Sequence, residues 1–267
     1  MRLTFHTVLK LATGAAVLAA GVALSGVRPL RAQDATPKAP SDYIVPFSML
    51  YVTAGKVNAD PSSLNAHFNR TDVATGFSAL SNDAYSVGFG GYVPISRVLA
   101  GFEWNYADFG YETSPQGKTN RGETSYFMAT VGVPLYTTWH FTVQPFLGVG
   151  GGSMRVTLKN RDGGNTVSLL RDPTFDEIVL SPGSESQVIG KYVILQPGIG
   201  IDYIVLQDDV KSRLGVTFGV RFGTIITPNR TTWKYRGHEV FGGPTFQPSG
   251  GSLRIIIGIG GFKMAKQ

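Results

Sequence analysis

The four histidines are the side chains with the most obvious catalytic or metal-binding chemistry: His6, His67, His140 and His238. None has the spacing of a zinc motif, and the chain has no cysteine, so we expect no metal site. A serine hydrolase would need a histidine within reach of a serine. His140 follows a tight turn, whereas His67 and His238 lie in polar stretches with no strand serine at a fixed spacing. The sequence therefore predicts no catalytic residues.

Two further segments could bind a cofactor or an ion. The glycines from Gly148 to Gly152 superficially resemble a nucleotide-binding loop, but no helical pattern follows them. Small side chains in a tightly curved sheet explain these glycines better. Several acidic residues share a long polar segment but lack the spacing of a calcium loop: Asp172, Asp176, Glu177 and Glu185. We therefore expect a solvated acidic loop and no cofactor.

The first 33 residues read as a secretory signal peptide. Arg2 and Lys10 precede an apolar run from Leu11 to Val27. Cleavage is expected after Ala32 or, as an alternative, after Ser25. A retained transmembrane anchor is the other interpretation, which the glycines of the run disfavour. Residues 34–42 are rich in proline and read as a flexible lead-in, so the predicted folded domain spans residues 43–267.

Removal of the signal peptide changes the charge balance. Four of the 24 basic residues lie in the leader and no acidic residue does, which leaves 20 basic against 18 acidic side chains, a net charge of +2. The high isoelectric point is thus largely due to the leader, and nucleic acid is not an expected partner. No apolar run after the leader is long enough for a spanning helix, so any crossing of a membrane requires strands.

The segment of residues 252–262 has the clearest strand pattern. Alternate positions form a bulky apolar face predicted to contact lipid: Leu253, Ile255, Ile257 and Ile259. The opposite face carries Arg254, Ile256, Gly258 and Gly260. A bulky outer face and a small or charged inner face are typical of a membrane barrel with a narrow lumen.

Eight such segments follow one another along the chain. The predicted strands are residues 47–56, 84–93, 98–107, 126–135, 141–150, 192–203, 215–223 and 252–262. Short connections alternate with long ones, among which residues 112–123 and 159–186 are predicted loops and residues 63–68 a short helical turn. We therefore predict an all-β fold, an eight-stranded antiparallel up-and-down transmembrane β-barrel with short periplasmic turns and long extracellular loops.

The inward positions carry a polar cluster. It comprises Glu103, Asp202, Arg221, Arg254, Gln144 and Gln196. Two acids and two bases balance, and unpaired charges in so narrow a space would be costly, so Glu103 is predicted to reach Arg254 or Arg221. Asp202 is expected to be hydrated instead. Four rim charges that never meet are the alternative.

Aromatic residues gather near the ends of the predicted strands. Trp104 and Tyr106 lie toward long loops, whereas Tyr136, Trp139 and Phe262 lie near short turns or the last strand's end. Two belts of aromatic side chains at the two membrane interfaces would have this distribution.

These features resemble the small eight-stranded bacterial outer-membrane barrels, such as the transmembrane domain of outer membrane protein A. Segments such as residues 144–151 and 198–203 look like strands of that superfamily. The family usually ends on its aromatic residue, whereas five residues follow Phe262, and a bulge at Gly260 and Gly261 is needed to turn Phe262 toward lipid. The resemblance implies export to the cell outer membrane, folding by periplasmic chaperones and the barrel assembly machinery, and a monomer surrounded by outer-membrane lipid.

Three functions remain open from the sequence. The first is a structural or surface-interaction role through the long external loops, the second a small passive or ligand-selective channel, and the third a lipid-modifying enzyme. Because an eight-stranded barrel is filled mostly by its own side chains, the first function is favoured over the second. Enzymatic activity is not expected, since no histidine has a strand serine at a fixed spacing.

Overall fold

The structure, a computed structural model, describes residues 43–69, 75–137, 141–161, 163–167, 171–206, 214–228, 231–246 and 248–265. The predicted signal peptide and lead-in lie outside the described residues. Eight long strands form the barrel: β1 (Tyr43–Asn58), β2 (Asp83–Ile95), β3 (Val98–Thr113), β4 (Lys118–Gly132), β6 (Phe141–Asn160), β7 (Glu185–Leu206), β8 (Leu214–Ile225) and β11 (Gly250–Ala265). No helix in these residues is long and apolar enough to cross a membrane.

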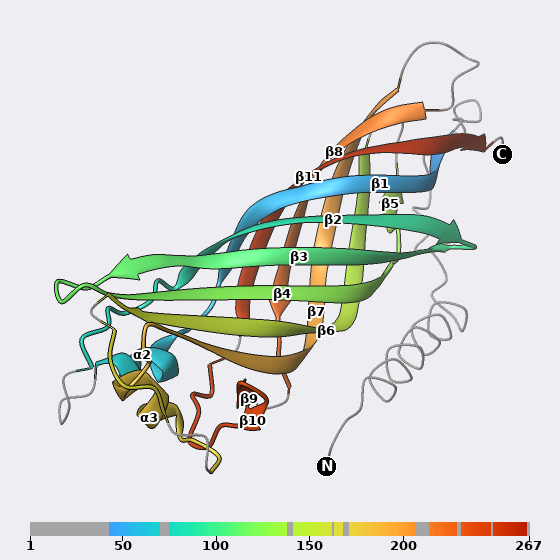
Figure 1. Ribbon diagram of the computed structural model, residues 1–267. Helices are drawn as coiled ribbons and strands as arrows, with labels where there is room; N and C mark the ends of the chain where they lie inside the picture. Colours follow the sequence, from blue (N-terminus) through green and yellow to red (C-terminus); the bar gives the residue numbers. More distant parts are fainter. Residues whose placement is uncertain are drawn as a thin grey trace.

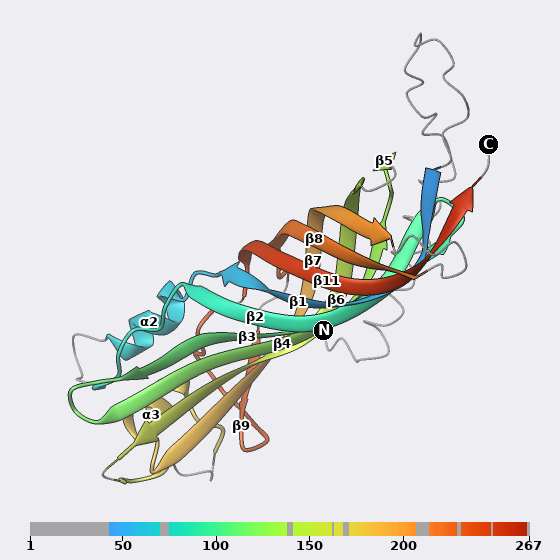
Figure 2. The same cartoon turned by 90° about the horizontal axis from the view of Figure 1, so that it is seen from above.

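All eight strands pair antiparallel in a closed ring. The order is β1-β2-β3-β4-β6-β7-β8-β11, and β11 pairs with β1 from Val57↔Ser252 to Tyr43↔Ala265, with one irregularity. Figure 1 and Figure 2 show the strands following one another around the barrel. The predicted up-and-down eight-stranded barrel is therefore confirmed.

The shorter elements lie at the two ends of the barrel. At one end are α2 (Ser62–Phe68), α3 (Phe175–Leu180), β9 (Thr232–Tyr235) and β10 (His238–Glu239), and at the other end is β5 (Tyr136–Thr137) (Figure 1). The helical turn predicted at residues 63–68 is α2. All four elements of the first group come from connections that the sequence pattern marks as long.

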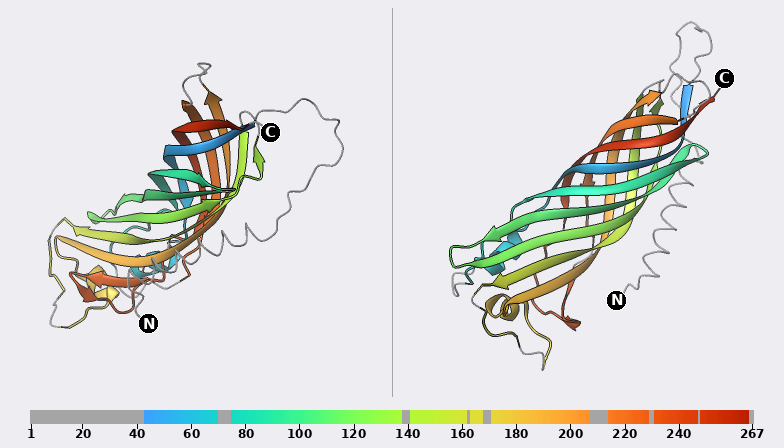
Figure 3. Two further views of the ribbon diagram at one scale, coloured as in Figure 1. Left: turned by 90° about the vertical axis from the view of Figure 1, so that its right-hand side faces the viewer. Right: turned by 45° about the horizontal axis from the view of Figure 1, so that its top comes forward.

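Two hairpins extend well beyond the rest of the barrel, as Figure 3 shows. β3 and β4 pair as far as Thr113↔Thr119, and β6 and β7 as far as Lys159↔Glu185. Residues 112–123 are thus mostly strand, and the predicted loop is wrong except for its tip between Thr113 and Lys118. The polar residues of this segment are typical of a loop. They belong to strands that continue beyond the apolar band, where the outer face of a strand contacts water and carries polar side chains.

Burial alternates along the strands as the barrel requires. On β11, Leu253, Ile255, Ile257 and Ile259 are 47 to 64 % exposed on the outer face, whereas Arg254 and Ile256 are fully buried. The other strands also expose large apolar residues, among them Leu50, Val87, Phe89, Phe127, Ile199 and Phe222. A continuous exposed apolar band of this kind is a lipid-contacting surface, not the surface of a soluble protein.

The expected bulge at the end of β11 lies on the neighbouring strand instead. Gly260 and Gly261 pair regularly with Gly215 and Leu214 of β8. The register with β1 shifts between Pro46 and Ser48, so β1 supplies the extra residue. The side chain of Phe262 is outside the described set, and its predicted interfacial placement stays a prediction.

We expect Ile257→Arg to lower the free energy of unfolding by about 2–4 kcal/mol, because it places a charge in the apolar band. Urea unfolding in phosphatidylcholine vesicles, followed by tryptophan fluorescence, measures this. The matched control is Gln187→Arg, which is also outward on a strand but lies beyond the band and should change stability by less than about 0.5 kcal/mol. Equal losses would refute the lipid-facing assignment.

Gly258→Ser, an inward change on the same strand, is unsuitable as that control. An added Cβ at Gly258 would lie 2.8 Å from the backbone oxygen of Leu50 and 2.9 Å from Cβ of Tyr51. We therefore expect Gly258→Ser to destabilise the barrel as well, because β1 approaches this glycine too closely for a side chain.

Candidate functional site

The first ion pair of the lumen joins Glu103 of β3 to Arg254 of β11. The two side chains are in contact, with exposed fractions of 3 % and 0 %. Glu103 also accepts hydrogen bonds from the Tyr51 hydroxyl at 3.1 Å and from Nδ2 of Asn105 at 2.6 Å. Thr53 in turn donates to Oδ1 of Asn105 at 3.1 Å. A chain of polar contacts therefore crosses the lumen from β11 through β3 to β1.

The second ion pair joins Asp202 of β7 to Arg221 of β8. Nη1 and Nη2 of Arg221 donate to the two carboxylate oxygens at 2.6 and 3.0 Å, which is the bidentate geometry. Nε2 of Gln144 donates to the same carboxylate at 2.9 Å. The expectation that Asp202 would be hydrated is wrong, since the register brings Arg221 close to it along β7 and β8.

Sheet register explains why two separate acids are needed. Arg254 and Arg221 are directly opposite each other on β11 and β8. Two like charges at this separation repel, so each requires its own carboxylate on its far side. Gln196, the sixth residue of the predicted cluster, donates from Nε2 to the Ser252 hydroxyl at 2.8 Å and does not join either ion pair.

Glycines opposite the large polar side chains make this layer possible. Each of the following residues pairs across strands with a glycine: Arg254 with Gly55, Arg221 with Gly200, Tyr51 with Gly90, Asn105 with Gly88 and Asp202 with Gly219. Each side chain lies over the position where the glycine lacks a Cβ. The inward glycines thus provide the volume in which the charged groups lie flat across the lumen.

A second, apolar layer closes the lumen toward the long-loop end. Inward residues of the barrel, such as Phe109, Met128, Met154 and Ile194, are buried in one cluster with residues of α2, α3 and β9. The loop residues of that cluster include Leu64, Phe68, Phe175, Ile178, Trp233, Tyr235 and Phe246. We refer to α2, residues 75–82, residues 171–174, α3, β9 and β10 together as the cap.

Specific contacts fix the cap against the extended hairpins. Lys118 Nζ donates to the backbone oxygen of Thr75 at 2.6 Å, and Asn120 Nδ2 donates to that of Ser78 at 2.7 Å. On the β7 side, β9 pairs with β7 from Val188↔Tyr235 to Lys191↔Thr232. The cap is therefore a packed part of the fold, not a set of separate loops.

The helix α3 is held by a capping box. The Thr174 hydroxyl accepts from the backbone N–H of Glu177, and Glu177 accepts from that of Thr174 at 2.8 Å. This backbone hydrogen bond lowers the pKa of Glu177. Acidic residues of the predicted acidic loop therefore have structural roles, and no metal-binding cluster is found among the described residues.

Two histidines of the cap contact carboxylates. Nδ1 of His67 is 2.6 Å from Oδ1 of Asp176, and Nδ1 of His238 is 3.3 Å from Oδ1 of Asp172. Within the described residues, no serine is hydrogen-bonded to either ring. The pairs join α3 and the segment before it to α2 and β10, so they serve as links within the cap.

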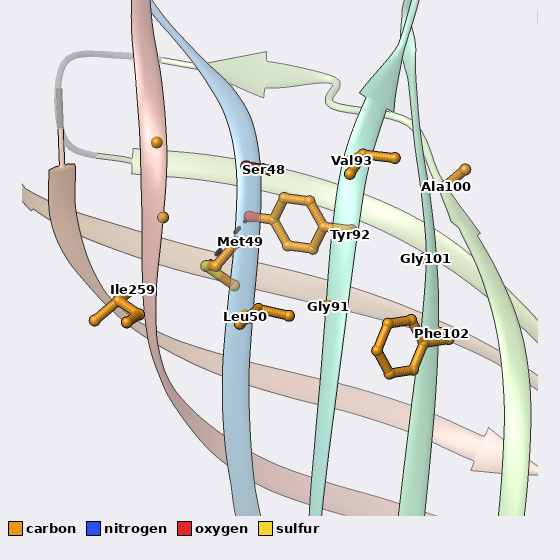
Figure 4. A pocket seen from close by; sticks show the side chains of 12 residues that line it. Ser48, Met49, Leu50, Gly91, Tyr92, Val93, Ala100, Gly101, Phe102 and Ile259 are labelled. Carbon is orange, nitrogen blue, oxygen red and sulfur yellow. Dashed lines mark hydrogen bonds between the residues drawn. The ribbon is translucent and has the colours of Figure 1, made fainter.

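A pocket of about 330 Å³ lies in the wall formed by β11, β1, β2 and β3 (Figure 4). Tyr92 points toward Met49, and its hydroxyl is 3.6 Å from the Met49 sulfur. Leu50, Phe102 and Ile259 complete an apolar lining. The described residues that line it include no carboxylate, histidine or basic side chain, and the Tyr92 hydroxyl is directed at the Met49 sulfur.

The predicted interfacial aromatics are placed as follows. Trp104 is outward on β3, with its ring 5.5 Å from Phe89, and Tyr106 lies two residues farther up, where its hydroxyl donates to Glu123 at 2.5 Å. Tyr136 is 61 % exposed at the opposite end. Trp139 lies outside the described residues. Trp104 and Tyr106 therefore mark the boundary at which the outer face changes from apolar to polar.

We expect loss of either partner of the Asp202–Arg221 pair to cost about 3–5 kcal/mol of unfolding free energy, because the remaining charge is buried without a partner. Asp202→Asn and Arg221→Met should each show this in vesicle unfolding, and the double variant should lose less than their sum. The exposed pair Lys56–Asp83, at 2.8 Å, is the control and should show a coupling of only about 0.2–1 kcal/mol. Similar coupling energies in the two cycles would contradict the buried-pair assignment.

Gly200→Ala should destabilise the barrel by about 1–3 kcal/mol through overpacking. Its new methyl group would lie 2.7 Å from Cζ of Arg221 and push the guanidinium away from Asp202. Gly251→Ala is the control, since a Cβ there would meet no atom within 4 Å. If both alanine variants unfold at the same urea concentration, glycine is not needed to seat Arg221.

Comparison with protein-family models gives no match, and neither does comparison with curated protein sequences. Among solved structures, the chain is similar to Ail, the attachment invasion locus protein of Yersinia pestis, alone and in complex with the heparin analogue sucrose octasulfate. The identity is 10 %, the TM-score 0.35, and the match covers 85 % of this chain and all of Ail. A major outer membrane protein of Thermus thermophilus matches with 10 % identity and a TM-score of 0.37, over 81 % of this chain and 99 % of that protein. The barrel assignment itself rests on the strand pairing described above.

Proposed function

We propose that the protein is a closed outer-membrane barrel that acts through its external cap, by contacts outside the cell. The exposed apolar band supports a location in a membrane, and the closed antiparallel sheet supports an outer membrane, where such barrels reside. Signal-directed export, periplasmic chaperones and the barrel assembly machinery would deliver it there. Because β1 pairs with β11, the described barrel strands leave no edge for another chain, which supports a monomer.

The filled lumen is the observation that carries this proposal. Toward the long-loop end it holds the apolar cluster shared with the cap, and nearer the other end it holds the Glu103–Arg254 and Asp202–Arg221 pairs. A small solute would have to break both layers to pass. The folded elements that remain available for function are therefore the cap and the outer faces of the extended hairpins.

The other two functions have less support. A channel would need a continuous polar lumen, whereas Phe175, Trp233 and their neighbours fill one end with apolar side chains. A lipid-modifying hydrolase would need a nucleophile beside His67 or His238, and the described residues hold their rings against carboxylates with no serine in the hydrogen-bonded set. The surface-interaction role requires only the folded cap and the outer faces of the extended hairpins.

Single-cysteine labelling tests which end of the barrel is external. Because the chain has no native cysteine, only the introduced cysteine can react. Arg171→Cys, in the cap segment, should react with a membrane-impermeant maleimide on intact cells. Arg97→Cys, in the turn between β2 and β3, should react only after the outer membrane is permeabilised. Labelling in the reverse order would place the cap in the periplasm and contradict the proposal.

Planar-bilayer recording tests whether the barrel conducts. We expect no steady conductance from the unmodified protein, and none from Glu103→Ala, because the apolar layer still closes the lumen when the polar layer is weakened. Steady conductance in the unmodified protein would support the channel instead. A pore that opens in Glu103→Ala alone would show that the polar layer is the only barrier.

A further inference from the structure

Basic side chains form a group on the outer face of β6, β7 and β9. They take part neither in the ion pairs of the lumen nor in the contacts that hold the cap. Arg155 of β6 pairs with Ile189 of β7, and Ile189 pairs with Lys234 of β9, so the three lie in one row. Lys191 lies two residues along β7 from Ile189 on the same face. Diagonal neighbours of this kind are about 7–8 Å apart, within reach of long side chains. We call Arg155, Lys191 and Lys234 the basic triad.

The two lysines of the triad differ from other basic residues on the outer wall of the barrel in having no close carboxylate among the described residues. Lys56 lies 2.8 Å from Asp83, Arg121 2.5 Å from Asp108, and Lys159 3.0 Å from Glu185. Within the described part of the chain, Lys191 and Lys234 form no ion pair, although Glu239 is opposite Lys234 in the sheet. Arg155 is 4.0 Å from Glu123, which is closer to Arg121 at 3.3 Å. The triad thus presents a net positive charge.

Its height relative to the apolar band suggests what it contacts. On β6 and β7, the outward apolar series ends at Gly151 and Val193, which pair in register and are followed on the same face by Ser153 and Lys191. Lys191 is two residues above Val193, and Arg155 is four above Gly151, which corresponds to about 7 and 13 Å along tilted strands. For strands tilted by roughly 45°, these lengths correspond to about 5 and 9 Å along the membrane normal, which puts the ends of the long side chains within reach of a headgroup layer about 5–7 Å thick.

We propose that the basic triad binds the phosphate of a membrane lipid whose acyl chains lie on the apolar wall below it. Arg155 offers a planar guanidinium for phosphate oxygens, and the two lysines add mobile positive charges. The Ser153 hydroxyl, in the row of Lys191, is a neutral donor for the same headgroup. Continuity with the apolar band favours a lipid over a free anion, and the inference rests on the proposed membrane location.

Retention of phosphatidylglycerol, measured by native mass spectrometry after release from mixed phosphatidylcholine bilayers, tests the inference. The unmodified protein should retain phosphatidylglycerol in preference to phosphatidylcholine. Lys191→Gln with Lys234→Gln should weaken its retention roughly 25-fold, about fivefold for each cation at an anionic surface. Lys56→Gln with Lys159→Gln removes the same charge from carboxylate-paired lysines and should leave retention within about twofold.

Equal losses in the two double variants, or no lipid preference in the unmodified protein, would overturn the inference. Complete displacement of phosphatidylglycerol by inorganic phosphate would also overturn it, since the acyl chains would then contribute nothing. A protein that fails to insert into bilayers at all would contradict the proposed membrane function. Insertion without preference for the anionic lipid would contradict only the lipid site.

Discussion

The pairing of β1 with β11 is the interaction on which the rest of the structure depends. In hydrocarbon, no water is available for an unpaired backbone N–H or carbonyl, so a sheet can cross only if it has no edge. The register from Val57↔Ser252 to Leu50↔Ile259 closes the ring within the apolar band. Once closed, each residue has a fixed inward or outward direction, and a shift of one residue would turn Ile257 inward and Arg254 to lipid.

Closure also fixes the radius, and the radius determines what the lumen holds. Large side chains fit only where the opposite residue is small, which is why Arg254 lies over Gly55 and Arg221 over Gly200. The same narrow space leaves little room for water around a charge, so each arginine is held by its own acid. Packing and charge pairing therefore depend on each other in this lumen. Replacement of one of these glycines by a larger residue would displace the arginine from its acidic partner.

Above the apolar band, the outer and inner faces of the strands have different surroundings. The extended hairpins β3–β4 and β6–β7 face water outside and carry pairs such as Arg121–Asp108. Their inner faces still present Phe109, Val156 and Leu158, which would be exposed without a cover. The long connections fold onto these faces as the cap, so the element proposed to act outside the cell is also what completes the apolar core.

The sequence by itself determined the strand number, the closed antiparallel fold and the outward-facing apolar side chains, because residue alternation is a local property that the pleat converts directly into direction. It also named the charged residues of the lumen, since a charge opposite an aliphatic stripe is visible within one strand. Only the tertiary structure decided that Asp202 pairs with Arg221, that residues 112–123 are largely strand, and that the bulge is on β1. Such features depend on register between strands and on volume across the lumen. The cap could not be predicted from the sequence for the same reason. Phe68, Phe175 and Trp233 are far apart in the chain, and only folding brings them into one core.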